Sequence, residues 1–251
     1  NTMGTASSMN SIAEALGMSL PGGAIIPAPY KERTDISFKT GKRIVEMVFE
    51  NLTPSKIMTK EAFENAVYVA SAIGASSNCP PHLTAIARHM GVDFNLDQWE
   101  KLGHSIPLLA NCQPAGEHLM EGFFKAGGIP AIMKELIKDK KLNIKALTVT
   151  GKTIEENLNM KIDVNRDVIK SYENPLSHNA GFIVMKSNFF SSAVMKTSVI
   201  SSEFRERYLS NKDSLNIFEV KAVVFEGPED YHTRINDDNL KIDENSILII
   251  R

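Results

Sequence analysis

The N-terminal stretch NTMGTASSMNSIAEALGMSL, from Asn1 to Leu20, shows most directly how this chain begins to fold. Ile12 and Leu16 lie one helical turn apart on an apolar face, and Gly17 stands where a helix C-cap is expected. The breakers that follow, from Pro21 to Pro29, predict a loop. The sequence therefore opens with a helix that ends at Gly17 and a connecting loop.

The same periodicity predicts more helices over the first two-thirds of the chain. We expect them over Thr34 to Asn51, Thr59 to Gly74, His82 to Met90, a short segment around Trp99, Leu119 to Lys125 and Pro130 to Lys138. Leu108 to Asn111 has the apolar run of a buried strand. Alternation of strands and helices favours α/β layering for this part of the chain.

The last third of the sequence changes character. Short β-branched or aromatic runs separated by polar turns predict strands at Phe182 to Met185, Ala193 to Met195, Phe218 to Phe225 and Ile247 to Ile250. Such runs are typical of a sheet or barrel. We therefore predict an α/β domain over residues 1–178, followed by the first part of a mainly β, barrel-like domain over residues 179–251.

Charge and hydropathy exclude two classes of partner. The chain carries 28 Lys and Arg against 30 Asp and Glu, a net charge of -2, and no basic stripe of the kind that binds nucleic acid. Its longest apolar runs fall far short of the roughly 20 residues that span a bilayer. No secretory leader precedes the first helix, so we expect a cytoplasmic protein without nucleic-acid or membrane partners.

The two cysteines do not form a recognisable framework. Cys79 and Cys112 match neither a disulfide pattern nor the paired spacing of a zinc site, so we expect reduced, partly buried thiols. His82 and His89 are two helical turns apart without a third ligand nearby. The residues themselves predict no metal site within this chain.

Several ordered blocks carry a family resemblance. They are Asn1 to Leu20, Pro27 to Arg33, Ser76 to Asn78 with Pro81 to Leu83, Leu109 to Gly116, Thr148 to Thr153, and Met195 to Ser198. In this order they resemble the dihydroxy-acid and phosphogluconate dehydratase family over nearly the whole chain. Asn1 to Leu20 resembles the segment that follows a cluster cysteine in that family.

The resemblance implies a hydro-lyase and its cofactors. Members of the family remove water from a 2,3-dihydroxy acid: a serine alkoxide takes the C2 proton, magnesium holds the carboxylate and the adjacent hydroxyl, and a cluster iron accepts the leaving hydroxyl. The metals act as Lewis acids and as a template. The full-length protein is therefore expected to carry an iron–sulfur cluster, 2Fe-2S or 4Fe-4S, and Mg, and to be a homo-oligomer, dimer or tetramer.

The departures from the family pattern are equally informative. The family's third cluster cysteine would precede Asn1, its other cysteines and magnesium ligands would lie further upstream, and its glutamate ligand and catalytic serine would follow Arg251. The chain therefore resembles an internal piece of such an enzyme. We expect no catalytic and no metal-binding residue in it, no cofactor held by it alone, and no activity in isolation.

Four residues remain as candidates for substrate binding: Thr2, Ser77, Asn78 and Lys196. Each lies in a resembling block at a helix start, a loop or a strand end, where side chains can face a pocket. We expect them to converge on one cleft between the two domains. The alternatives are a helix-capping hydroxyl for Thr2, ordinary loop hydrogen bonds for Ser77 and Asn78, and a solvent-facing Lys196.

The acidic and imidazole groups of Glu229 to His232 leave two interpretations open, a metal site or a helix N-terminus that favours acidic residues. For the substrate, Pro27 to Tyr30 and Gly227 to His232 resemble the sugar-acid branch, which implies dehydration of an aldonate to a 2-keto-3-deoxy acid.

Three alternatives to an aldonate dehydratase stay open. Within the family these are dihydroxy-acid dehydratase of branched-chain amino-acid synthesis and phosphogluconate dehydratase. Outside it, the chain could be a non-catalytic fold fragment or interaction module. A generic nucleotide-binding domain is disfavoured because no Gly-x-Gly-x-x-Gly follows a strand.

Overall fold

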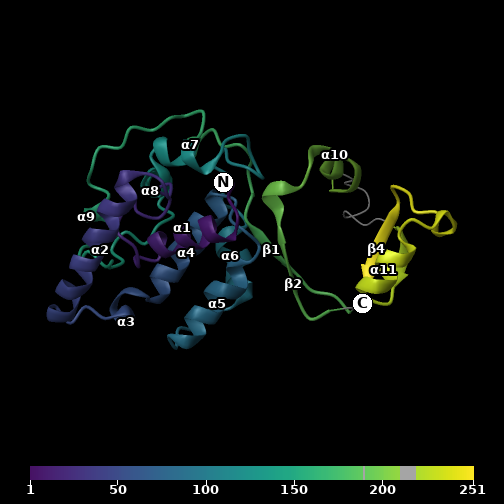
Figure 1. Cartoon of the computed structure of the whole chain (residues 1–251), viewed down its shortest axis with the longest axis horizontal. Helices are drawn as coiled ribbons and strands as arrows, with labels where there is room; N and C mark the ends of the chain where they lie inside the picture. The colour runs from purple at the N-terminus through teal and green to yellow at the C-terminus, as the bar shows by residue number, and fades with distance from the viewer. Residues whose placement is uncertain (189, 210–218) are drawn as a thin grey trace. The chain divides into compact units, whose positions relative to one another are not determined.

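Helices are the main regular elements of residues 1–199, the first of two compact units (Figure 1). The computed structural model describes residues 1–188, 190–209 and 219–251. The helices of this unit are α1 (Thr5–Ala15), α2 (Lys31–Phe49), α3 (Pro54–Ile57), α4 (Lys60–Ala72), α5 (Cys79–His89), α6 (Leu96–Gly103), α7 (Met120–Lys125), α8 (Gly128–Lys138) and α9 (Ile154–Asn157). The helices expected from apolar periodicity are therefore confirmed, with ends shifted by a few residues.

Local signals explain where several helices begin and end. Gly17 has φ +83° directly after α1, a conformation that glycine adopts without steric cost. Asn95 caps α6 in a capping box with Gln98. Pro80 lies in the first turn of α5, where its missing N–H leaves no helical hydrogen bond unmade.

The core of the first unit is centred on α4. An aromatic row runs from Phe63 of α4 through Phe94 and Trp99 to Phe182, with ring centroids 5.5, 6.5 and 5.2 Å apart in that order. Phe63, Trp99 and Phe182 are almost completely buried. Tilted and edge-to-face pairs of this kind stabilise beyond the area that they bury. This row ties α4 and α6 to β1 (Phe182–Met185).

The prediction of a regular strand over Leu108 to Asn111 was wrong. The segment is buried, but its backbone donors bond to separate segments: Leu108 to the carbonyl of Ser177, Leu109 to that of Ala72, and Asn111 to that of Val168. Only isolated bridges result, because no single neighbouring strand runs beside it. Strand pairing within residues 1–181 is confined to such bridges, and the α/β layering expected for residues 1–178 stays a prediction.

The strands predicted for the last third are confirmed as two separate pairs, except that Phe218, the expected start of the third strand, lies outside the described residues. β1 pairs antiparallel with β2 (Ala193–Lys196), which leads into a 3₁₀ turn, Thr197–Val199. In the second unit, residues 200–251, β3 (Lys221–Phe225) pairs parallel with β4 (Ser246–Ile250). The other elements described for that unit are α10 (Ser202–Phe204), a π-helix (Arg205–Leu209), α11 (Pro228–Arg234) and a 3₁₀ turn (Asp238–Leu240).

Parallel strands cannot be joined by a tight hairpin, and the segment that contains α11 supplies the crossover between β3 and β4. Among the described residues these two-stranded sheets do not close into a barrel, so the barrel-like domain stays a prediction. The domain boundary between residues 178 and 179 also stays a prediction. The compact units themselves divide between Val199 and Ile200.

Candidate functional site

A cluster of hydroxyl and amide groups surrounds the start of α1. Thr5 Oγ1 lies 3.1 Å from Ser76 Oγ and accepts a 2.8 Å hydrogen bond from Asn78 Nδ2. The backbone N–H of Ser76 donates to Ser8 Oγ at 2.9 Å. We call Thr5, Ser8, Ser76 and Asn78 the polar cluster. It joins the first turn of α1 to the small-residue loop between α4 and α5.

The N-terminus of α1, the positive end of its helix dipole, has no side-chain cap among the described residues. Gly4 is the N-cap residue and offers no side-chain acceptor, and the turn contains no acidic residue. The backbone N–H groups at a helix N-terminus carry partial positive charge and favour an anion nearby.

Lys196 reaches the same loop from the end of β2. Its Nζ donates a 2.6 Å hydrogen bond to the carbonyl of Gly74. Burial of the half-buried ammonium lowers the pKa of Lys196. No carboxylate pairs with Lys196 in the described ranges of the chain. The structure thus places a partly desolvated positive charge against a neutral carbonyl.

The predicted substrate residues divide into two pairs. Asn78 and Lys196 both contact the loop that follows α4, Asn78 as part of it and Lys196 through Gly74. Thr2 and Ser77 are exposed, and within the described residues neither hydroxyl has a hydrogen-bond partner. The common cleft for all four residues stays a prediction.

Both cysteines are buried thiols. Cys79 lies beneath the loop, near Ser8 and Lys196, and burial raises its pKa to about 12. Burial also raises the pKa of Cys112 to about 12. Because the thiolate is the metal ligand, these two sites disfavour the form that would bind a metal. Over the described part of the chain no three His, Cys, Asp or Glu side chains gather in a way that could hold a metal ion.

The sequence analysis missed Glu14, a buried carboxyl in α1. Its two oxygens accept hydrogen bonds from the backbone N–H groups of Gly22, at 2.7 Å, and Ala24, at 3.0 Å. Burial raises the pKa of Glu14 to about 7, against the opposing effect of these two hydrogen bonds. An acidic residue inside the apolar run from Ile12 to Leu16 was the signal that could have revealed it.

Glu14 thereby anchors the loop that borders a second polar region. A hollow of about 400 Å³ lies between that loop and α1, and Ser7, Asn10, Arg33 and Glu121 contribute its polar lining. Arg33 donates to the carbonyls of Gly23, at 3.3 Å, and Ile26, which holds the loop in place.

The acidic residues at Glu229 to His232 have a structural explanation. Glu229 and Asp230 lie in the first turn of α11, which the helix dipole favours. Asp230 accepts the backbone N–H of Glu226 at 2.9 Å and pairs with Arg234 at 2.8 Å. These contacts support the interpretation as a helix N-terminus.

In the described ranges, no helix combines the length and the apolar character that crossing a membrane requires.

Known proteins match along the whole chain. The N-terminal model of the dihydroxy-acid/6-phosphogluconate dehydratase family matches residues 1–157, and the C-terminal model matches residues 167–251. The chain is 52% identical to the D-xylonate dehydratase of Caulobacter vibrioides over 251 residues. The matched residues are 100% of this chain and 42% of that protein. Against the L-arabinonate dehydratase of Rhizobium leguminosarum bv. trifolii it is 44% identical over 240 residues, 95% of this chain and 40% of the relative.

A dihydroxy-acid dehydratase of Acetivibrio thermocellus is 39% identical over 241 residues, 96% of this chain and 42% of that protein. The chain thus spans about two-fifths of the length of the relatives that it matches.

Proposed function

The chain belongs to the dihydroxy-acid/6-phosphogluconate dehydratase family, and from this premise we propose that it is part of an enzyme that dehydrates an aldonate to a 2-keto-3-deoxy acid. In such a reaction the C2–H and C3–O bonds break and water leaves. The enol that remains becomes the 2-keto acid. The higher identity to the two sugar-acid dehydratases than to the dihydroxy-acid dehydratase supports an aldonate, such as a pentonate or hexonate, as substrate.

In the structure, the polar cluster and Lys196 are the groups that support the proposal. An aldonate combines a carboxylate with a row of hydroxyl groups. The N–H groups at the start of α1 and the Lys196 ammonium suit the carboxylate, because neither has an acidic side chain beside it among the described residues. The hydroxyl and amide groups of the polar cluster suit the sugar hydroxyls.

The proposed cofactors do not fit the residues of this chain by themselves. Cys79 and Cys112 are separate buried thiols, and the described residues include no metal-ligand cluster. We therefore propose that groups of the longer enzyme outside these residues hold an iron–sulfur cluster, 2Fe-2S or 4Fe-4S, and Mg. The barrel-like domain would likewise be completed by that part, since the relatives are more than twice as long as this chain. What we assign to this chain is substrate binding and orientation.

The test uses the full-length enzyme and a panel of aldonates, with a dihydroxy-acid and a phosphogluconate as competitors. We expect Lys196→Met to raise KM for the preferred aldonate by roughly 10- to 100-fold, because a hydrogen bond to a charged group contributes about 1.5–3 kcal/mol. Lys196→Arg should retain most of the affinity. Lys186→Met is the matched control, since Lys186 pairs with Asp97 on the surface, 3.1 Å away.

Two results would contradict different parts of the proposal. Turnover of the competitors but of no aldonate would refute the sugar-acid substrate. An unchanged KM in Lys196→Met, with aldonate turnover intact, would refute the role of Lys196 and leave the reaction standing.

A further inference from the structure

Helix α2 contacts the rest of the first unit along one of its faces. Arg43 Nε donates a 2.6 Å hydrogen bond to the carbonyl of Val149. Met47 is the buried residue of this helix, and it packs with Ile57 and Val149 in a small core of its own. Figure 1 shows α2 at the margin of the helical unit, with α1 and α4 nearer its middle. These contacts fix which side of α2 faces outward.

The outward side of α2 is apolar. Phe38 is 77% exposed, Val48 72% and Phe49 86%, and Ile44 and Val45 are each more than half exposed. Residues three, four and seven positions apart lie on one side of a helix, so these side chains form a continuous strip. The acidic and basic residues of α2, such as Asp35, Lys39 and Glu46, lie on the remaining flank. We call Phe38, Ile44, Val45, Val48 and Phe49 the α2 strip.

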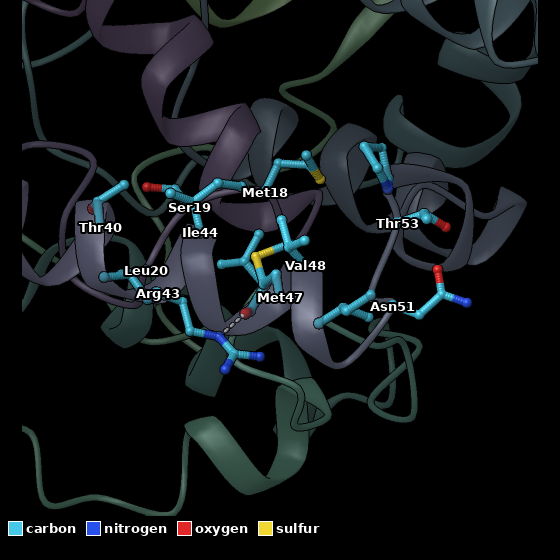
Figure 2. Close-up of a pocket in the computed structure, with 13 residues that line it drawn as sticks. Met18, Ser19, Leu20, Thr40, Arg43, Ile44, Met47, Val48, Asn51 and Thr53 are labelled. Atoms are coloured by element: carbon cyan, nitrogen blue, oxygen red, sulfur yellow. Dashed lines mark hydrogen bonds between the residues drawn. The ribbon is translucent and has the colours of Figure 1, made fainter.

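A groove of about 470 Å³ runs beside the strip (Figure 2). Met18, Leu20 and Leu52 line it together with Ile44 and Val48 of α2 itself. The same surface therefore offers protruding aromatic side chains and, next to them, an apolar depression. A two-fold symmetric interface requires this combination, because each copy must supply both the protrusion and the hollow.

We propose that a second copy of the protein docks on the α2 strip, with the two α2 helices packed antiparallel across a two-fold axis near Gly41. Gly41 lies within the strip, and a Cβ added there would meet no atom within 4 Å, so another helix can approach closely. An axis at this point sets Phe38 of each copy against Val45 of the other. The strip carries no charge, so that pairing two copies buries no unpaired ion.

The exposed area supports a second copy as the occupant. Taking about 200 Å² for a fully exposed phenylalanine and less for aliphatic side chains, the α2 strip presents on the order of 600 Å² per copy. Monomeric proteins seldom leave a larger apolar patch in water. With the lining of the groove added, the area approaches the roughly 800 Å² per partner that a stable interface buries.

A cysteine substitution at the proposed axis tests the geometry in the full-length protein. A disulfide needs Cα atoms about 4.4–6.8 Å apart, so Gly41→Cys should form an intermolecular disulfide between the two copies of position 41 under mild oxidation, identified by peptide mass mapping. Lys39→Cys, on the charged flank of the same helix, is the matched control and should not. Cys79 and Cys112 are buried and compete little. Phe38→Glu with Val45→Glu should convert the dimer seen by light scattering to monomer or to a smaller assembly.

Each other outcome overturns the proposal. If the thiol introduced by Gly41→Cys reacts freely with a thiol reagent and forms no disulfide, the strip stays in solvent. If that thiol is protected from the reagent without forming a disulfide, another part of the same protein covers the strip. Neither outcome bears on the proposed dehydration.

Discussion

Helices α4 and α2 make opposite use of their apolar residues. α4 has 13 residues and buries nine of them, whereas α2 has 19 residues and buries Met47. Both helices contain phenylalanine and valine, yet those of α4 lie in the core while most of those of α2 face outward. Helical stability in proteins comes mostly from packing of the apolar face. The chain thus supplies the surroundings of α4 itself, and α2 retains an unused apolar face.

Polar groups differ between the two regions in the same way. In the packed region the buried Asn65 of α4 is bonded on both sides of its amide: it donates to the carbonyl of Asn143, at 3.2 Å, and accepts the backbone N–H of Asn143, at 2.8 Å. At the end of α2 the ion pair between Arg43 and Glu50, at 2.5 Å, is about half exposed on the Glu50 side, at 47%. Removing a partner from a buried bond leaves an unsatisfied group, whereas an exposed ion pair contributes little.

The largest expected effect compares two phenylalanines. Phe63→Ala in α4 should lower the free energy of unfolding by about 3–5 kcal/mol, because Phe63 is completely buried and its removal leaves a cavity. Phe38→Ala on α2 should change it by less than about 0.5 kcal/mol in dilute protein, where the side chain faces water. Urea unfolding of both variants measures the difference. A loss of similar size in both would mean that the α2 strip is already covered within one chain.

The next effect is a pH dependence that belongs to the packed region. Burial raises the pKa of Glu14 to about 7 from an ordinary value of 4.5. The folded state therefore holds a proton that the unfolded state releases between these pH values, so this group's contribution to stability falls as pH rises from about 4.5 to about 7. The size is on the order of 3 kcal/mol, from 1.36 kcal/mol per pKa unit.

Glu14→Gln removes this titration. The wild-type protein should lose stability relative to Glu14→Gln as pH rises over that interval, measured by thermal or urea unfolding at several pH values. Glu50→Gln, directly after α2, is the control. The hydrogen bond from Arg43 lowers the pKa of Glu50, so its contribution is present above pH 4.5 and is lost only below it. Parallel pH curves for wild type and Glu14→Gln would contradict the buried titration.

Most of the helices and strands could be predicted from local signals in the sequence. Asn95, Pro80 and Gly17 act through their own backbone or side chain, so their effect on helix ends can be predicted from sequence. The segment Leu108 to Asn111 could not be predicted in this way. Its apolar run does indicate burial, but whether a buried segment forms a ladder depends on which distant segments lie beside it.

In the candidate site, too, residues that local sequence identifies differ from residues whose role depends on distant contacts. Asn78 and Lys196 could be singled out by their blocks, but Thr5 and Ser8 were not, because their contacts with Ser76 and Asn78 join positions about 70 residues apart. Glu14 was missed for a related reason. Its place in an apolar run indicates burial, but its hydrogen-bond partners are backbone N–H groups of a loop, which a sequence does not identify.

The smallest expected effect concerns Thr2, which is exposed like the α2 strip but lies at the start of the packed region. Since its hydroxyl has no partner among the described residues, Thr2→Val should change the free energy of unfolding by less than about 0.5 kcal/mol. If Thr2 contacts the substrate, turnover by the full-length enzyme should fall by roughly tenfold, the loss of one positioned hydrogen bond.

Thr5→Val is the control with the opposite profile. The Thr5 hydroxyl bonds to Ser76 and Asn78, so its loss should lower the free energy of unfolding by about 1 kcal/mol. We thus propose two roles for exposed groups of this chain: the α2 strip as a face for a second copy, and the Thr2 hydroxyl as a contact for a small ligand. Unchanged turnover in Thr2→Val would remove Thr2 from the site, and the polar cluster and Lys196 would remain as the candidate binding groups.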